Sequence, residues 1–106
     1  MVALEIRPNC ELCDRDLPPD SPDARICSYE CTYCADCVEH VLCNVCPTCG
    51  GNFVPRPIRP LRSWRPELKL GREFRPPSEK RVHSKYDRAE IDAQVARIRG
   101  LAPEDR

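Results

Sequence analysis

Residues 27–37 read Cys27-Ser28-Tyr29-Glu30-Cys31-Thr32-Tyr33-Cys34-Ala35-Asp36-Cys37. The pair Cys10-x2-Cys13 precedes this stretch, and Cys43 and the pair Cys46-x2-Cys49 follow it. A gap of two residues allows a tight turn to aim two thiolates at one cation. The eight paired cysteines match two tetrahedral sites of four thiolates each, with Cys43 left over. The sequence therefore predicts a small α+β fold that is stabilised by metal.

The chain is too small to depend on a hydrophobic core alone. It has 106 residues, of which only six are aromatic, while nine are cysteine and twelve are proline. A domain of this size buries little apolar surface and needs an additional source of stability. The size also weighs against most ordinary enzymes, because no second layer is available to form a deep cleft.

Charge and composition divide the chain near Val54. Residues 1–54 hold three basic and nine acidic residues, whereas residues 55–106 hold fourteen basic and eight acidic residues. Every cysteine lies in the first part, and six of the twelve prolines lie between Pro55 and Pro77. We therefore expect a cysteine-rich head (1–54), an extended Pro/Arg-rich linker or arm (55–86), an amphipathic helix (87–100) and a disordered end (101–106).

Two other uses of the cysteines compete with a metal site of this kind. A disulfide framework is typical of secreted chains with an even number of cysteines, whereas this count is odd and the N-terminus lacks an export signal. An iron–sulfur cluster would suit Cys31-x2-Cys34-x2-Cys37, but that run continues with a Cys-Pro pair after three more residues. Position 41 is valine here, and the Cys-Pro pair comes later, at Cys46-Pro47.

The eight paired cysteines resemble the ligands of a RING-type cross-brace zinc finger. Leu12 before the second ligand, Tyr33 before the fifth and the closing Cys46-Pro47-Thr48-Cys49 agree with that pattern. Cys31 replaces the usual histidine, residues 38–45 lack a tryptophan, and Gly50 replaces a frequent basic residue. The resemblance implies two Zn²⁺ ions, one held by Cys10, Cys13, Cys34 and Cys37, the other by Cys27, Cys31, Cys46 and Cys49.

A second resemblance covers about residues 4–62. The runs Glu5 to Asp14, Asp16 to Ser21, Cys31 to Cys37 and Arg56 to Pro60 are similar to a small bacterial cysteine-rich family with no assigned function. The resemblance implies a cytoplasmic, bacterial setting, in which ubiquitin is normally missing.

The segments between the cysteines predict few regular elements. Ala24 to Cys27 and Tyr29 to Thr32 suggest a short hairpin, and Asp36 to Leu42 a short helix with Asp36 and Glu39 as a capping box. Near the C-terminus, Asp87-Arg88-Ala89-Glu90 predicts the start of a second helix and Gly100 its end. Its apolar stripe is formed by Ala89, Ile91, Val95 and Ile98.

His40 and Cys43 are the ambiguous members of the head. His40 follows Cys37 by three residues and is either an extra ligand or, as we expect, a solvent-facing side chain. Cys43 is interpreted as a half-buried small hydrophobe, with a redox thiol or a substitute ligand as the alternatives. The sequence indicates no catalytic residue, because paired thiolates leave no open position on the metal.

The tail carries a basic stripe. Arg56, Arg59, Arg62 and Arg65 recur at every third position, as along one edge of a polyproline II strand, and Trp64 interrupts them. This stripe is either a solvated linker or a binding arm for acidic protein or phosphate.

Together these patterns predict a non-enzymatic zinc-binding protein that binds a macromolecule, with a protein as the expected partner. Leu12, Arg56, Arg59, Arg62, Trp64 and Arg65 are the candidate contact residues. A ubiquitin-ligase-like module acting through Leu12, a nucleic-acid-binding tail, and a redox or metal sensor using Cys43 are the alternatives. No apolar run approaches the roughly 20 residues that span a bilayer, so no membrane partner is expected. No small-molecule substrate is expected either, because the chain is too small to form a deep cleft.

Overall fold

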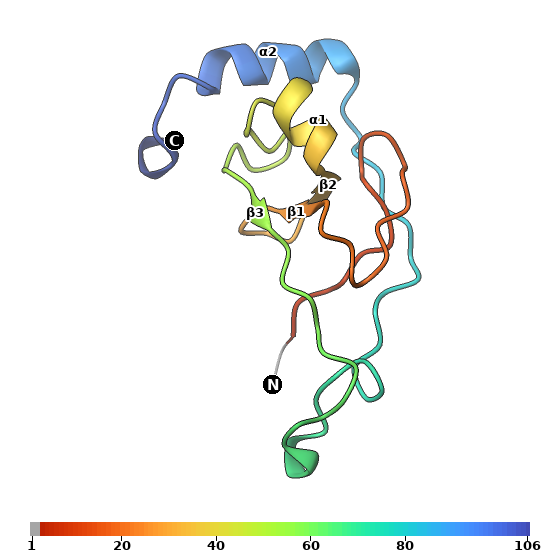
Figure 1. Cartoon of the computed structure of the whole chain (residues 1–106). Coiled ribbons are helices and arrows are strands. Elements are labelled where there is room, and N and C mark those ends of the chain that lie inside the picture. The colour runs from red at the N-terminus through yellow and green to blue at the C-terminus, as the bar shows by residue number, and fades with distance from the viewer. Residues whose placement is uncertain (1–2) are drawn as a thin grey trace.

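The computed structural model describes residues 3–106, so the first two residues of the predicted head lie outside the described residues. The molecule is elongated, with extents of 47 × 28 × 20 Å. A small sheet and two α-helices occupy one end, and an extended loop forms the other (Figure 1). These elements make the fold a small α+β structure, as the sequence predicts.

The sheet has three short antiparallel strands in the order β2-β1-β3: β1 (Ala24–Ile26), β2 (Thr32–Cys34) and β3 (Val54–Pro55). Arg25 lies opposite Tyr33 on one side and Pro55 on the other. The predicted hairpin is present, but its second strand begins at Thr32 because Glu30 adopts a left-handed φ of 68° within the turn. Strand β3 was not expected. It lies at the edge of the sheet, where a proline is tolerated.

Helix α1 (Ala35–His40) begins one residue earlier and ends two residues earlier than predicted, and its predicted cap is wrong. Cys34 occupies the N-cap position, and no side chain caps the helix. The amide of Ala35 instead donates to the carbonyl of Asp23 at 2.8 Å, so a neighbouring loop satisfies one of the free donors of the first turn.

Helix α2 (Arg88–Ile98) confirms the predicted cap, because the Asp87 carboxylate accepts from the Glu90 amide at 2.8 Å. Ile91 and Val95 are buried in the core of the head, and Ile98 packs against it. Ala89 was predicted on this stripe but is exposed. The helix therefore docks on the head beside α1 (Figure 1).

The core is small and contains most of the cysteines. Its largest fully buried side chain is Tyr33, whose ring meets that of Phe53 edge to face at 5.4 Å. Its aliphatic part includes Leu17, Leu42 and Val45 beside Ile91 and Val95 of α2. So few large side chains supply limited apolar burial, which agrees with the expected need for another source of stability.

Residues 78–86, here called the strap, return from the extended loop along the N-terminal segment (Figure 1). The amide of Ser78 donates to the carbonyl of Ile6 at 2.9 Å, and that of Ser84 donates to the carbonyl of Glu11 at 2.8 Å. Between these points the Asn9 side chain donates to the Val82 carbonyl and accepts from its amide. The strap is therefore bound to the head by backbone hydrogen bonds near both ends and by the Asn9 side chain between them.

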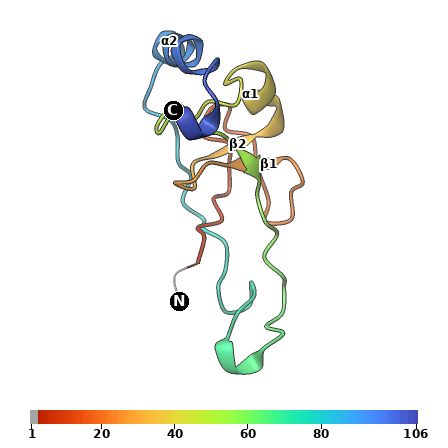
Figure 2. The ribbon, with the colours of Figure 1, turned by 90° about the vertical axis from the view of Figure 1, so that its left-hand side faces the viewer.

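Residues 57–76, here called the lobe, protrude from the head at the end of the long axis (Figures 1 and 2). The lobe holds only a 3-10 turn, η1 (Pro66–Leu68), and backbone bonds such as that from the Arg72 amide to the Pro60 carbonyl at 2.9 Å. Gly71 has a φ of 87°, and a Cβ there would lie 2.6 Å from the carbonyl carbon of Arg62. Close backbone packing at a glycine thus shapes the lobe.

The C-terminal residues differ from the expected disorder. Residues 101–106 contain the 3-10 turn η2 (Pro103–Asp105), and the Arg106 guanidinium donates to the carbonyls of Asn44 and Gly50. These contacts fasten the end of the chain to the loop that carries the last cysteine pair. No helix in residues 3–106 combines the length and apolar character needed to cross a bilayer.

Candidate metal centre

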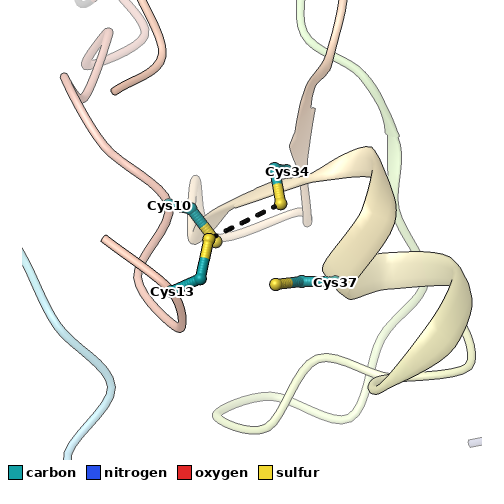
Figure 3. Close-up of side chains that lie close together, drawn as sticks. All are labelled: Cys10, Cys13, Cys34 and Cys37. Atoms are coloured by element: carbon teal, nitrogen blue, oxygen red, sulfur yellow. Dashed lines mark hydrogen bonds between the residues drawn. The ribbon is translucent and has the colours of Figure 1, made fainter. Parts of the chain in front are cut away.

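Four cysteines from two separate parts of the chain converge in cluster one. The sulfur atoms of Cys10, Cys13, Cys34 and Cys37 all lie within 4.8 Å of one another. Figure 3 shows Cys10 and Cys13 reaching in from the N-terminal loop, opposite Cys34 and Cys37. Cys34 ends β2 and Cys37 lies in the first turn of α1, so a strand and a helix position two of the four ligands.

A tight turn positions the first pair. The amide of Cys10 donates to the carbonyl of Arg15 at 2.8 Å, and the amide of Asp14 donates to the carbonyl of Cys10 at 2.9 Å. Asp14 has a left-handed φ of 65°. This conformation turns the chain after Cys13 and brings both sulfurs to the same side.

Cluster two contains three of its four predicted members. The sulfurs of Cys27, Cys31 and Cys46 lie within 4.8 Å of one another, and all three residues are buried. Cys49 does not join them at that distance: it is exposed, and its sulfur accepts from the Gly51 amide at 3.4 Å. A turn holds it nearby, because the Gly50 amide donates to the Cys46 carbonyl and the Cys46 amide to the Gly51 carbonyl.

Hydrogen bonds among the sulfurs of cluster two shift the pKa values of its thiols in opposite directions. Hydrogen bonds from Cys31 and Cys46 lower the pKa of Cys27 to about 2. The bond to Cys27 raises the pKa of Cys31 to about 11, and bonds to the same neighbours raise the pKa of Cys46. Adjacent sulfurs cannot all carry a negative charge without a cation among them. A divalent cation would replace the thiol protons and allow every thiolate to form.

Cluster one behaves in the same way. Burial raises the pKa of Cys10 and of Cys37. Burial also acts to raise the pKa of Cys13, but hydrogen bonds from the Arg15 amide and the neighbouring thiols outweigh it, and this pKa falls. The donor set is thus all sulfur, which suits Zn²⁺ or another soft, thiolate-preferring metal.

The two clusters interleave along the chain. The first and third cysteine pairs meet in cluster one, whereas the second pair meets Cys46 of the fourth pair in cluster two. The two pairs of cluster one therefore flank Cys27 and Cys31 in the sequence. Likewise, the members of cluster two flank Cys34 and Cys37. A metal at both positions would fix the loops of the head without a large core.

Two polar residues beside the clusters were not identified by the sequence analysis. Asn9 is fully buried, and its amide donates to the Cys10 carbonyl as well as to the strap. Glu11 is buried as well and accepts from the Thr32 amide and from Arg7. Asn9 immediately precedes a ligand, but its partner Val82 lies 73 residues away, and no local pattern indicates that contact.

The strap makes a charged contact beside cluster one. Arg81 donates to both Asp14 and Asp16, and the His83 ring lies 2.8 Å from the Asp14 carboxylate. Hydrogen bonds from His83 and Arg81 lower the pKa of Asp14. These exposed ion pairs orient the strap on the turn that follows Cys13.

The ambiguous residues of the head occupy the positions that we favoured. The His40 side chain is 75% exposed and lies 3.7 Å from Glu39, outside both clusters. Cys43 is half-buried and packs against the core, with a left-handed φ of 47°. Leu12 also packs partly against the core.

The basic stripe is not the continuous exposed edge that the sequence suggested. Arg56 is only 5% exposed and donates to the carbonyls of Arg7, Leu17 and Pro18, because β3 turns it into the head. Arg59 donates to the carbonyls of Leu4 and Arg75. Arg62, Trp64 and Arg65 remain exposed.

Comparison with known proteins places the cysteines within a family. The family described as "Protein of unknown function (DUF1272)" matches residues 3–59, just over half of the chain. An uncharacterized protein from Rhizobium meliloti (strain 1021) is 65% identical over 57 residues, which are 54% of this chain and 68% of that protein. No solved structure matches. The matched region includes all nine cysteines but not α2, the strap or most of the lobe.

Proposed function

The chain belongs to the DUF1272 family, and on this premise we propose that it is a non-catalytic, RING-like zinc protein that binds another protein. The observation that carries the proposal is the pair of interleaved, all-sulfur clusters. Binding of one structural Zn²⁺ supplies about 10–16 kcal/mol of apparent folding free energy, more than so small a core provides.

Under this proposal, cluster two needs Cys49 as its fourth ligand. Cys49 lies at the exposed end of a turn, and its backbone is already linked to Cys46 through Gly50 and Gly51. A rotation of this side chain would supply the fourth thiolate. We therefore assign Cys10, Cys13, Cys34 and Cys37 to one Zn²⁺, and Cys27, Cys31, Cys46 and Cys49 to the other.

The protein partner follows from the acidic character of the head. Residues 1–54 carry a formal charge of −6, from three basic and nine acidic residues. A four-thiolate zinc site retains a formal charge of −2, which would make the head more negative still. Such a surface favours a basic protein segment, and we place the chain in the cytoplasm, where thiols stay reduced.

Ubiquitin-ligase-like transfer has less support. That hypothesis requires a free surface at Leu12 and at the loop after Cys37. Leu12 packs partly into the core, and Arg106 binds the carbonyl of Asn44 in that loop. The Gln94 side chain of α2 also donates to the carbonyls of Cys46 and Pro47.

Native mass spectrometry with cobalt substitution tests the metal assignment. We expect two Zn²⁺ per chain, and intense thiolate-to-Co²⁺ charge-transfer absorption after exchange. Cys37→Ser and Cys49→Ser should each weaken one site, whereas the matched variant Cys43→Ser should retain both. A disulfide-bonded chain, visible iron–sulfur absorption or a single zinc in the unaltered protein would contradict the assignment.

A further inference from the structure

We propose that the lobe, residues 57–76, binds the surface of an anionic lipid bilayer. This function lies beyond the metal-dependent role of the head. The earlier expectation of no membrane partner rested on the absence of a spanning segment. A contact in which the lobe lies in the headgroup region requires no such segment.

The lobe concentrates exposed apolar side chains. Five large ones are between 48% and 77% exposed: Ile58, Leu61, Trp64, Leu68 and Phe74. The only buried residue of the lobe is Gly71, so these side chains form no core of their own. Backbone bonds and the close approach at Gly71 hold the lobe instead. An exposed apolar group that the fold does not require marks an interaction surface.

Cationic side chains surround these apolar residues. The lobe holds five arginines and one lysine against two glutamates, a net charge of +4. None of the ion pairs within residues 3–106 includes a lobe cation. Arg62, Arg65, Lys69 and Arg75 are also exposed. These charges are therefore available to an anionic partner.

The position of the lobe determines how the molecule would approach an anionic bilayer. It forms one end of the long axis, whereas α2 lies at the other end and the acidic head lies between them (Figures 1 and 2). An anionic surface would attract the lobe and repel the head, so the molecule would approach with the lobe foremost. The four prolines of the lobe lack an N–H, which lowers the cost of removing its backbone from water.

The side chains favour lipid over the other anionic partners. Three of the five apolar residues are aliphatic and cannot stack on bases as the aromatic residues of single-strand-binding proteins do. A protein partner would need an acidic-rimmed pocket that encloses the convex lobe, whereas a bilayer accepts any convex apolar group. Tryptophan beside arginine and lysine is typical of elements that lie in the interface, buried by about 5–10 Å.

Trp64 provides a direct test, because it is the single tryptophan of the chain and is 77% exposed. The zinc-loaded full chain is titrated with vesicles of phosphatidylglycerol and phosphatidylcholine, with phosphatidylcholine alone, with polyglutamate and with oligo(dT). We expect a blue shift of the Trp64 emission, and quenching by brominated lipid, only with the anionic vesicles. A shift that is equal or larger with either polymer, or none with anionic vesicles at low salt, would overturn the proposal.

Two sets of variants distinguish lipid binding by the lobe cations from a general effect of the net charge of the protein. Arg62→Gln, Arg65→Gln and Lys69→Gln together should lower the partition coefficient on the order of 100-fold. The control Lys80→Gln, Arg97→Gln and Arg99→Gln has the same net charge and alters exposed cations outside the lobe, so its loss should be below tenfold. Leu61→Ser with Leu68→Ser should abolish quenching by brominated lipid. Equal losses in the two charge sets, or unchanged quenching, would contradict the proposal.

Zinc content is measured in the same samples. Lobe variants that bind two Zn²⁺ and lose lipid binding support this inference independently of the head. A chain that binds no metal but still inserts Trp64 refutes the proposed function of the head and leaves the lobe assignment standing.

Discussion

At the scale of single residues, the thiols of the two clusters predict that metal affinity depends on pH. Cys31 and Cys46 in cluster two, and Cys10 and Cys37 in cluster one, have raised pKa values and so hold protons at neutral pH. A metal must displace those protons, so the bound form holds fewer of them and affinity rises with pH.

Each displaced proton changes the metal affinity of a cluster about tenfold per pH unit. Release of two protons from each cluster therefore predicts that its metal affinity falls about 100-fold for each pH unit of acidification. Competition titrations with a chromogenic zinc chelator between pH 6.5 and 7.5 measure this slope. An affinity that does not change with pH would show that the ligands are not these thiols.

Arg56 is predicted to be a stability residue. Its guanidinium donates to three carbonyls inside the head, and Arg56→Gln would leave at least one of them without a partner. We expect a loss of about 2–4 kcal/mol in the free energy of unfolding.

Urea unfolding of the zinc-loaded protein measures this loss. The control Arg65→Gln, at an exposed position nine residues further along, should stay within about 0.5 kcal/mol of the free energy of unfolding of the unaltered chain. Equal effects of the two substitutions would refute the buried role of Arg56.

At the scale of elements, α2 depends on the head rather than on its own propensity. An isolated helix of eleven residues is marginal in water, and Ile91 and Val95 anchor this one in the core. Ile91→Ala should lower the free energy of unfolding by about 2–4 kcal/mol and accelerate amide hydrogen exchange along the whole helix.

The exposed position Ala93 offers a control on the same helix, where Ala93→Ser should leave exchange nearly unchanged. Two bound metals are expected in both variants. Slow exchange retained in Ile91→Ala would mean that the helix is stable without this anchor.

Local chemistry explains which elements the sequence could predict. The Asp87 cap of α2 and the cysteine pairs involve residues within a few positions of one another, so their spacing is visible in the sequence. The capping box at Asp36 was wrong because Cys34 occupies the cap position and Ala35 finds a partner in another loop. Strand β3 and the burial of Arg56 depend on contacts with residues far away in the sequence.

At the scale of the whole molecule, we predict that metal binding and docking of the strap are coupled. Asn9 joins the carbonyl of Cys10 in cluster one to Val82 of the strap. Removal of metal should unfold the N-terminal turn and thereby release the strap, since a site of this kind does not persist without its ion.

Limited trypsin digestion followed by mass spectrometry tests this coupling. With zinc, cleavage should be concentrated after exposed lobe cations that no proline follows, such as Arg62 and Lys69. After chelation, Arg81 in the strap should become a site of rapid cleavage. Protection of Arg81 in the chelated protein would show that the strap is held without the metal.

The interleaving of the clusters also sets an order of events as the chain leaves the ribosome. All four ligands of cluster one have been synthesised once Cys37 is added, whereas Cys46 of cluster two comes nine residues later. At cellular rates of translation that interval is about one second. During it Cys27 and Cys31 are already present without their partner, so the nascent chain offers four thiols to close cluster one and two spare thiols that compete for the same ion. Under the proposed zinc assignment, a head that is assembled in this order requires free Zn²⁺ during its translation.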